Sequence, residues 1–405
     1  MSAGTTWTID AAELQAWDAE YVMTTYARLP VMFVSGEGAR LWDADGKEYL
    51  DFLSGIAVCG VGHCNPRVAE AISRQASTLM HTSNLFYTPL QPRLARRLCE
   101  LSGMERAFFG NSGAEANECA LKIARKWAKQ HRGPDCFEVV TFEGSFHGRT
   151  MATIAATAQP KYQEPFRPLV PGFRHVPLGD LPALDAAIGE RTCAVMIEPI
   201  QGESGVRVVS PDFLAAIRAL CDEAGVLMIA DEVQTGMGRT GRFLACQGAG
   251  VRPDIVTLAK SLAGGVPMGV CLASGAAART LSPGDHASTF GGQPLACAAA
   301  LAVLDVMEEQ QLIDNAASTG AFFLDALRSL VRAMPDRLLE ARGAGLMVAL
   351  EFREPIARNT MLALLADGVV VNAIGDRILR FLPPLVVTEN DCARVVSALR
   401  RVLCP

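Results

Sequence analysis

Short apolar runs alternate with helical patterns between about residues 65 and 300, and this alternation limits the fold more than any other feature of the sequence. The runs are RAFFGN, FEVVTF, CAVMIEP, VLMIAD, DIVTLA and GVCLAS. Strands separated by helices predict a mostly parallel sheet with helices on both faces. The expected fold class is therefore α/β.

Two of these runs have one polar group at their carboxyl ends. Asp231 closes VLMIAD, and Lys260 follows DIVTLA. Open α/β sheets bind ligands in the crevice beyond these ends, so both side chains are expected to face one pocket. A buried carboxylate and a lysine able to form a Schiff base are the protein groups that pyridoxal phosphate needs. For two isolated residues, an exposed acid and a surface lysine are the commoner explanation.

The length and a change of pattern predict two domains. A chain of 405 residues is too long for one simple core. Residues 61–304 are expected to form a large domain. In residues 305–405 a long helix and sparser strands predict a smaller α+β domain. Residues 1–60, with a helical start and a hairpin at the DADG turn from Asp43, are expected to join it, because neither piece alone could bury much of a core.

The composition excludes several classes of protein. A formal net charge of -6 leaves no basic footprint, so nucleic acid is not an expected partner. The 12 cysteines are scattered, without zinc spacing, which predicts reduced thiols and no metal. The amino terminus lacks the pattern of a signal peptide, and the apolar stretch from Pro294 is too short to span a bilayer. We therefore expect a cytoplasmic protein outside the membrane.

Two segments offer places for a phosphate. In FFGNSGAEANE, a strand and a small-residue turn precede a helix, so the backbone N–H groups of Ser112, Gly113 and Ala114 could hold an anion. HASTFGGQP offers the hydroxyls of Ser288 and Thr289 before a glycine pair. Each segment could equally be only the start of a helix.

Three further segments could contact a ring or a carboxylate. In FHGRT, Phe146 or His147 could cover a flat ring, and Arg149 suits a carboxylate. Glu203 lies in a glycine-flanked loop after CAVMIEP, and Arg380 lies near a strand end in RFLPP. Taken singly, these would be an ordinary loop, a solvated acid and a surface charge.

The segment GMGRTG from Gly236 matches the GxGxxG pattern of dinucleotide-binding proteins. Such a fingerprint must follow its strand directly and open a helix, with an acid about 20 residues further on. Here DEVQT intervenes, and Lys260 lies near the place of that acid. The segment is therefore interpreted as a glycine-rich surface loop, and a dehydrogenase is disfavoured.

Taken together, these segments resemble the class III, ω-type aminotransferases of fold type I, and within them the acetylornithine aminotransferases of arginine biosynthesis. The resemblance runs through SGIAV, GHCNP, HTSNLFYT, NSGAEANE, FHGRTMAT, QPKYQ, PGFRHVP, IEPIQGESG, IADEVQTGMGRTG, TLAKSLAGGVPMG, STFGGQPLA and LRFLPPL. Small departures stand at Cys59, Asn65 and Gln293. The resemblance implies pyridoxal 5'-phosphate as cofactor and a large domain with a mostly parallel, seven-stranded sheet plus a smaller α+β domain built from both termini.

The same resemblance implies roles around the cofactor. Lys260 would bind it as a Schiff base and, once displaced, would move the substrate proton. Asp231 would keep the ring nitrogen protonated. Gln234 would bond the phenolic oxygen, and Val233 and Phe146 would sandwich the ring, with His147 a further contact.

The resemblance also implies a homodimer with shared active sites. Ser112, Gly113 and Ala114 would cradle the phosphate. Thr289 would reach the phosphate of the neighbouring subunit's cofactor, so the active unit would contain two chains.

Substrate contacts are implied in the same way. Arg149 would bind the distal carboxylate, with Ser288 on the acetylornithine end, and Arg380 would bind the α-carboxylate of glutamate. Glu203 would neutralise Arg380 when an ω-amine occupies the site, because an unpaired buried charge is costly. Ile56 stands where ornithine aminotransferases have a tyrosine, which fits an acylated amine.

The function expected from the resemblance is N-acetylornithine:2-oxoglutarate 5-aminotransferase, working by a ping-pong cycle in arginine biosynthesis. Its products would be N-acetylglutamate 5-semialdehyde and glutamate. Succinylornithine, ornithine and 4-aminobutyrate transamination remain alternatives, as does a secondary activity on succinyl-diaminopimelate. A non-catalytic protein that retains the cofactor is disfavoured, because the lysine, the aspartate and both arginines are present.

Overall fold

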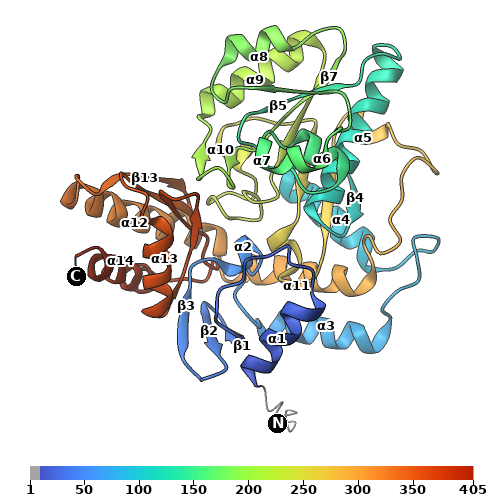
Figure 1. Ribbon diagram of the computed structural model, residues 1–405. Coiled ribbons are helices and arrows are strands. Elements are labelled where there is room, and N and C mark those ends of the chain that lie inside the picture. The colour runs from blue at the N-terminus through green and yellow to red at the C-terminus, as the bar shows by residue number, and fades with distance from the viewer. Residues whose placement is uncertain (1–9, 405) are drawn as a thin grey trace.

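A seven-stranded sheet forms the centre of the larger part of the molecule, as seen in the computed structural model, which describes residues 10–404 (Figure 1). Its strand order is β4-β12-β11-β10-β7-β5-β6. Only β12 runs against its neighbours β4 and β11. The strands are β4 (Arg106–Gly110), β5 (Glu138–Phe142), β6 (Phe173–Val176), β7 (Thr192–Ile197), β10 (Leu227–Asp231), β11 (Ile255–Leu258) and β12 (Gly269–Ala273). The predicted mostly parallel sheet is thus confirmed.

Each of the six apolar runs forms one strand of this sheet, whereas the edge strand β6 was not predicted. The sequence of β6 is FRHV, and Arg174 and His175 are exposed at its centre. An edge strand with one partner needs no continuous apolar run, because only part of it is covered.

Helices cover both faces of the sheet because successive side chains of a strand point to opposite faces. On β10, Ile229 packs in the cluster that contains helix α5 (Gly113–His131). Its neighbour Met228 packs on the other face, with α8 (Leu181–Ala187) and α9 (Pro211–Ala224).

In the second part of the structure, the N-terminal strands lie beside C-terminal elements (Figure 1). Strand β15 (Val369–Val370) pairs in parallel with β3 (Glu48–Asp51), which extends the β1-β2-β3 sheet. The predicted hairpin joins β2 (Arg40–Asp43) to β3. Helix α11 (Pro294–Glu309) is the predicted buried helix and continues past residue 304, and the domain boundaries themselves stay a prediction.

The remaining elements complete this frame. A second sheet has the order β13-β14-β17-β16. The other elements are α1 (Ala11–Tyr21), β1 (Phe33–Glu37), α2 (Ser54–Ala57), α3 (Pro66–Thr78), α4 (Leu90–Ser102), α6 (Met151–Ala156), α7 (Pro160–Gln163), β8 (Ile200–Gln201), β9 (Arg207–Val208), α10 (Ala245–Gly248), α12 (Leu312–Ala333), β13 (Leu338–Ala344), β14 (Met347–Phe352), α13 (Ala357–Ala366), β16 (Asn372–Ile374), β17 (Ile378–Phe381) and α14 (Glu389–Leu403).

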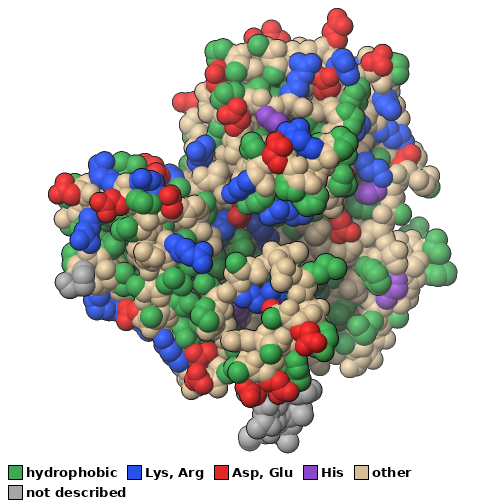
Figure 2. Space-filling model, in the orientation of Figure 1, with side chains coloured by type: hydrophobic (Ala, Val, Ile, Leu, Met, Phe, Trp, Pro, Cys, Tyr) green, Lys and Arg blue, Asp and Glu red, His purple; other side chains and the backbone are tan. Residues whose placement is uncertain are grey.

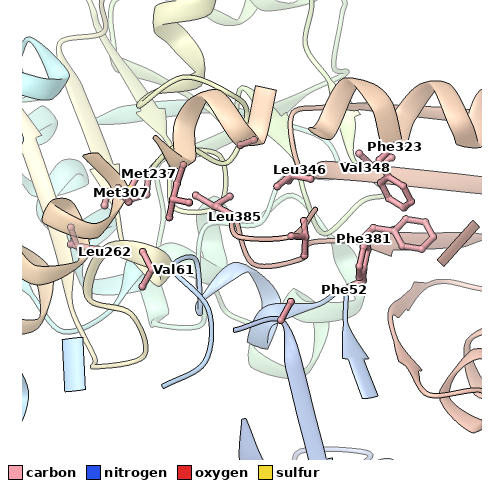
Figure 3. Close-up of a cluster of buried hydrophobic side chains, with 14 of the residues drawn as sticks. Phe52, Val61, Met237, Leu262, Met307, Phe323, Leu346, Val348, Phe381 and Leu385 are labelled. Atoms are coloured by element: carbon pink, nitrogen blue, oxygen red, sulfur yellow. The ribbon is translucent and has the colours of Figure 1, made fainter. Parts of the chain in front are cut away.

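One hydrophobic cluster connects the two parts of the structure. Figure 3 shows it running from Met307 on α11, through Leu385, to Phe323 on α12 and Phe381 on β17. Phe52, from the N-terminal segment, packs against Phe323 with ring centroids 5.4 Å apart. Burial of this size is the main favourable contribution to folding, so the two parts hold each other in place.

Several expectations about composition can be compared with the structure. All 12 cysteines, which lie within the described residues, are free, and most are buried, as predicted. No helix between residues 10 and 404 is long and apolar enough to cross a membrane. The first nine residues, part of the segment in which no signal peptide was expected, lie outside the described residues.

Helix α12 packs closely on the turn between β13 and β14. A Cβ atom placed on Gly320 would lie 2.2 Å from the carbonyl oxygen of Gly345. That turn is itself fixed, because a Cβ on Gly345 would lie 2.6 Å from the carbonyl oxygen of Arg239. Helix α12, the β13–β14 turn and the 236–241 loop are therefore closely packed against one another.

Replacing Gly320 by alanine is expected to destabilise the protein, although alanine favours helices by about 1 kcal/mol relative to glycine. The clash with backbone atoms should outweigh this gain, for a net loss of about 1–3 kcal/mol. The measurement is the thermal midpoint by circular dichroism. Gly189→Ala is the control, since its Cβ would meet nothing within 4 Å. Equal midpoints for the two variants would refute the tight packing.

Candidate active site

A cavity of about 380 Å³ opens beyond the carboxyl ends of β10 and β11. Asp231, the last residue of β10, and Lys260, two residues after β11, both line it. Figure 2 shows this face of the molecule hollowed near its centre, with basic side chains visible inside. The sheet therefore brings the two polar strand-end groups into one pocket.

The carboxylate of Asp231 is buried and held by several hydrogen bonds. Its Oδ2 accepts from Nδ2 of Asn117 at 2.8 Å and from Nδ1 of His147 at 2.8 Å. Its Oδ1 accepts from the backbone N–H of Val233 at 3.1 Å. Three hydrogen bonds from different segments fix this carboxyl group in one orientation.

Asn117 is a site residue that the sequence reasoning missed. Its Nδ2 also donates to the carbonyl oxygen of His147 at 2.8 Å, while the hydroxyl of Thr257 donates to its Oδ1 at 2.7 Å. Asn117 thereby joins α5, the FHGRT loop and β11 around Asp231. The available signal was a polar residue on the apolar face of a predicted helix, four residues after Gly113.

Lys260 begins the short 3-10 helix η2 (Lys260–Ala263) with φ at 49°, in the left-handed region. Burial lowers its pKa to about 8, with Glu203 opposing and Arg380 assisting the shift. A lysine with such a pKa has a substantial neutral fraction near neutral pH. The neutral amine is the form that attacks a carbonyl carbon.

Glu198 is a second residue that the sequence reasoning did not select. It accepts from the backbone N–H of Phe146 at 2.8 Å and lines the same cavity. Burial, and then the charge of Asp231, raise its pKa well above the ordinary value. The surroundings of Glu198 therefore disfavour its charged form. It ends the CAVMIEP run, so the rule that found Asp231 would also have found it.

The N-terminus of α5 forms one end of the cavity. Ser112 is the N-cap residue, and its hydroxyl accepts from the N–H of Glu115 at 3.2 Å. Ser112, Gly113 and Ala114 line the cavity. At Gly113 a Cβ atom would lie 2.8 Å from Cγ1 of Val233, so only glycine leaves room there. Free N–H groups at a helix start are a ready anion site.

Arg380, in contrast to an ordinary strand-end arginine, is buried. Its Nη1 donates to Oε1 of Glu203 at 2.6 Å and to Oε1 of Gln234 at 3.3 Å. Its Nη2 donates to Oδ1 of Asn372 at 2.8 Å. Burial raises the pKa of Glu203, but the charge and hydrogen bond of Arg380 lower it overall. The pair is thus an ion pair at neutral pH.

Arg149 lies at the mouth of the cavity and is exposed. Its guanidinium carbon stands 4.0 Å from the ring centroid of Tyr162 and 5.6 Å from that of Phe146. Stacking on two rings orients the guanidinium while leaving its N–H groups free for a carboxylate.

Five of the predicted site residues do not line this cavity. Arg380 and Glu203 adjoin it through hydrogen bonds with Gln234, which lines it. Ser288 and Thr289 line a separate hollow of about 630 Å³, next to Asn84 and Phe109. Ile56 is 38% exposed and has φ at 64°. Within one chain, Ser288, Thr289 and Ile56 therefore lie outside the lining of the Lys260 cavity, although Asn111, which lines it, donates from Nδ2 to Oγ of Ser288 at 3.2 Å.

The GMGRTG segment forms turns between β10 and α10, and no helix starts within it. Arg239 in this segment is buried and donates from Nη1 to the carbonyl oxygens of Leu346 (3.2 Å) and Pro383. The segment is a structural connection to the second part of the chain, which agrees with rejecting the dinucleotide interpretation. The interpretation as a surface loop was wrong, because residues 236–239 are buried.

Comparison with known proteins identifies the family. The model of the class III aminotransferases matches residues 21–403. The chain belongs to the class III aminotransferase family. It is 49% identical to the acetylornithine aminotransferase of Methanocaldococcus jannaschii over 385 residues, covering 95% of this chain and 96% of that protein.

Two solved structures show the same fold. The ornithine aminotransferase of Toxoplasma gondii crystallised with oxidised glutathione, described with partial occupancy of PLP at its active site, matches with a TM-score of 0.93 and 38% identity, covering 97% of this chain and 93% of that one. The acetylornithine aminotransferase of Elizabethkingia anophelis matches with a TM-score of 0.87 and 34% identity, covering 98% and 99%. The expected fold type I is thereby confirmed.

Class III aminotransferases use pyridoxal phosphate, and the cavity of this member fits that group. The start of α5 suits the phosphate, and the buried carboxylate of Asp231 suits a protonated ring nitrogen. The amine of Lys260 suits the aldehyde, and the side chains of Val233 and Phe146 are available for the ring.

Covalent loading of the cofactor-free protein is expected to follow the titration of Lys260. With a pKa of about 8, the rate should rise about ten-fold between pH 7 and 9 and then level off, because only the neutral amine reacts. Stopped-flow absorbance with added pyridoxal phosphate measures this rate. A simple alkylamine provides the control, and a protein rate that keeps rising to pH 10.5, as the alkylamine's should, would contradict the lowered pKa.

Proposed function

We propose that this chain is an N-acetylornithine:2-oxoglutarate 5-aminotransferase. The observation that carries the proposal is the Arg380–Glu203 ion pair, which adjoins the cavity of Lys260 through Gln234, because it suits a site that must accept two unlike amino donors. The name of the 49% identical Methanocaldococcus jannaschii relative supports the same activity.

The residues of the cavity divide the chemistry between them. Pyridoxal phosphate, when bound, supplies the electron sink for the carbanion of the substrate. Asp231 holds a proton on the ring nitrogen, and its bonds from Asn117 and His147 keep it aligned. Lys260, once exchanged for the substrate amine, carries a proton to and from the substrate carbon. Positioned proton transfer of this kind contributes about 10²–10⁴-fold.

The Arg380–Glu203 pair lets one site accept a different substrate in each half-reaction. Glutamate has an α-carboxylate beside its reacting carbon, and this group would take the place of Glu203 on Arg380. The ω-amine end of N-acetylornithine has no carboxylate there, so Glu203 remains paired with Arg380. Both substrates are then accepted without an unpaired buried cation.

The distal carboxylate of N-acetylornithine is assigned to Arg149. Its guanidinium lies at the mouth of the cavity and is oriented by Tyr162, so it can meet a long substrate at the far end from Lys260. A bidentate contact there would fix the length of the substrate.

Four amines should distinguish the activities when added to the cofactor-loaded enzyme without an oxoacid. We expect N-acetylornithine to bleach the visible band of the bound cofactor at least about ten-fold faster than ornithine or 4-aminobutyrate. Equal rates with succinylornithine would indicate a shared acylornithine enzyme. Faster bleaching by ornithine would overturn the proposal. Lys260→Ala should bleach with none of them.

We also propose that the active unit is a dimer with shared sites. Three consecutive large side chains are exposed in the single chain: Leu85 (85%), Phe86 (70%) and Tyr87 (104%). Asn84 beside them donates to the carbonyl oxygen of Ser288 at 3.1 Å. An apolar surface next to the 288–289 segment suits a second copy, to which Thr289 would present its hydroxyl.

Co-expressed Lys260→Ala and Thr289→Asp chains test this sharing. Each variant alone should be nearly inactive, the second because its new charge repels the phosphate. A mixed dimer with shared sites contains one site with neither change, so the purified mixed dimer should recover about half of the wild-type rate. Activity is assayed after tandem-tag purification. If the mixed dimer has the normal size but recovers no activity, the two chains do not share their active sites.

A further inference from the structure

The carboxyl group of Glu198 is bonded to two different segments beside the cavity. Its Oε1 accepts from the backbone N–H of Phe146 at 2.8 Å, and its Oε2 accepts from the backbone N–H of Gly202 at 3.4 Å. Glu198 follows directly on β7, is buried and lines the cavity. None of the steps of transamination described above involves this residue.

Each of these segments carries a group that is assigned to a substrate carboxylate. The 143–149 segment ends at Arg149, whose guanidinium carbon lies 5.6 Å from the ring centroid of Phe146. The 199–205 segment contains Glu203, which pairs with Arg380. One carboxyl group therefore contacts both segments that are expected to recognise the substrate.

Gly202 connects Glu198 directly to Arg380. The N–H of Gly202 donates to Glu198, and its carbonyl oxygen accepts from Nη1 of Arg380 at 3.1 Å. A Cβ atom on Gly202 would lie 2.0 Å from Oε1 of Gln234, which also accepts from Arg380. A shift of Gly202 would therefore displace one of the acceptors that hold Arg380.

The 143–149 segment is also fixed at the residues that follow Phe146. The N–H of His147 donates to Oγ1 of Thr157 at 2.8 Å. A Cβ atom on Gly148 would lie 2.8 Å from Cβ of Ala114, so this part of the segment packs closely on the start of α5. Glu198 and Thr157 thus bind two successive N–H groups of one segment, but only Glu198 also binds the other segment.

The two segments are joined a second time, away from the cavity lining. Nε2 of Gln201 donates to the carbonyl oxygen of Glu143 at 3.0 Å, and neither residue lines the cavity. Glu198 is therefore the connection on the cavity side, and Gln201 is the connection on the other side.

We propose that Glu198 is a positioning residue that fixes the separation between Arg149 and the Arg380–Glu203 pair, and thereby selects substrates of one length. This role rests on the proposed function, which assigns the two ends of the substrates to these groups. A carboxyl group suits the role because its two oxygens can accept from both backbone N–H groups at once. A glutamine has only one acceptor oxygen, so it can hold only one of the two segments.

The first test measures amide hydrogen exchange of the holoenzyme by peptide mass spectrometry. In Glu198→Ala, exchange should become about ten-fold faster in both segments, because an N–H group in each has lost its acceptor. Glu198→Gln should restore the protection of one segment only. Thr157→Val is the matched control, since it removes the bond from His147 and should speed exchange in the 143–149 segment alone.

Two outcomes of this test would refute the double connection. One is unchanged exchange in either segment of Glu198→Ala, and the other is full protection of both segments in Glu198→Gln. If Glu198→Ala fails to fold, as judged by circular dichroism, Glu198→Gln decides the question.

The second test compares two amines of equal chain length on the wild type and on Glu198→Gln. N-Acetylputrescine is N-acetylornithine without the carboxylate that is assigned to Arg149. The substitution should raise KM for N-acetylornithine about ten-fold with kcat little changed, because Arg149 is no longer held at the correct distance. KM for N-acetylputrescine should stay within about two-fold of the wild-type value. Equal changes of the two KM values, or no change in either, would overturn the proposal.

Failure of the proposed function itself would give a different result. A wild-type enzyme that does not prefer N-acetylornithine to N-acetylputrescine would overturn both the assignment of Arg149 and the selection of substrate length by Glu198. The exchange rates do not depend on the substrate, so they would still show whether Glu198 connects the two segments.

Discussion

The rest of the site depends on one buried carboxylate, that of Asp231. An ionised group in the interior is tolerated only when its oxygens are hydrogen-bonded. Here the partners come from α5 (Asn117), from the FHGRT loop (His147) and from the turn after β10 (Val233). Satisfying one charge thus brings together the helix start suited to the phosphate, the loop that carries Phe146 and the strand edge that precedes Lys260. The cavity exists because these segments converge on that carboxylate.

Two buried arginines join the two parts of the chain beside this cavity. Arg380 comes from β17 and meets Glu203, Gln234 and the carbonyl oxygen of Gly202 at 3.1 Å. Arg239, which belongs to the large part, donates hydrogen bonds to carbonyl oxygens of the second part. Because a guanidinium in the interior requires partners in fixed directions, these contacts set the position of β17 relative to Lys260. Substrate recognition and the docking of the two parts therefore share the same groups.

Much of this could be predicted because the sheet is parallel and buried. Apolar runs marked six of its strands, and the strand-end rule placed Asp231 and Lys260 together. Strand β6 was missed because an edge strand can be polar, and Asn117 because its partners are distant in sequence. Ile56 was selected from the family resemblance alone, and Ser288 and Thr289 from their hydroxyls and the resemblance together; within one chain none of the three lines the cavity. The proposed sharing of sites between two chains would give Thr289 its role, and no pattern within one sequence can place a second chain.

The pairing of β3 with β15 has a consequence for how the protein is made. Residues 48–51 leave the ribosome early, but their parallel neighbour at 369–370 emerges only near the end of synthesis. Closing so long a loop is slow relative to local folding, and domains generally fold as they emerge. The large sheet can thus form while the first fifty residues still lack their neighbour. Until residues 369–370 emerge, β3 presents an unpaired strand edge. Such an edge can pair with the same edge of another nascent chain, so rapid completion of the chain or a chaperone would protect it.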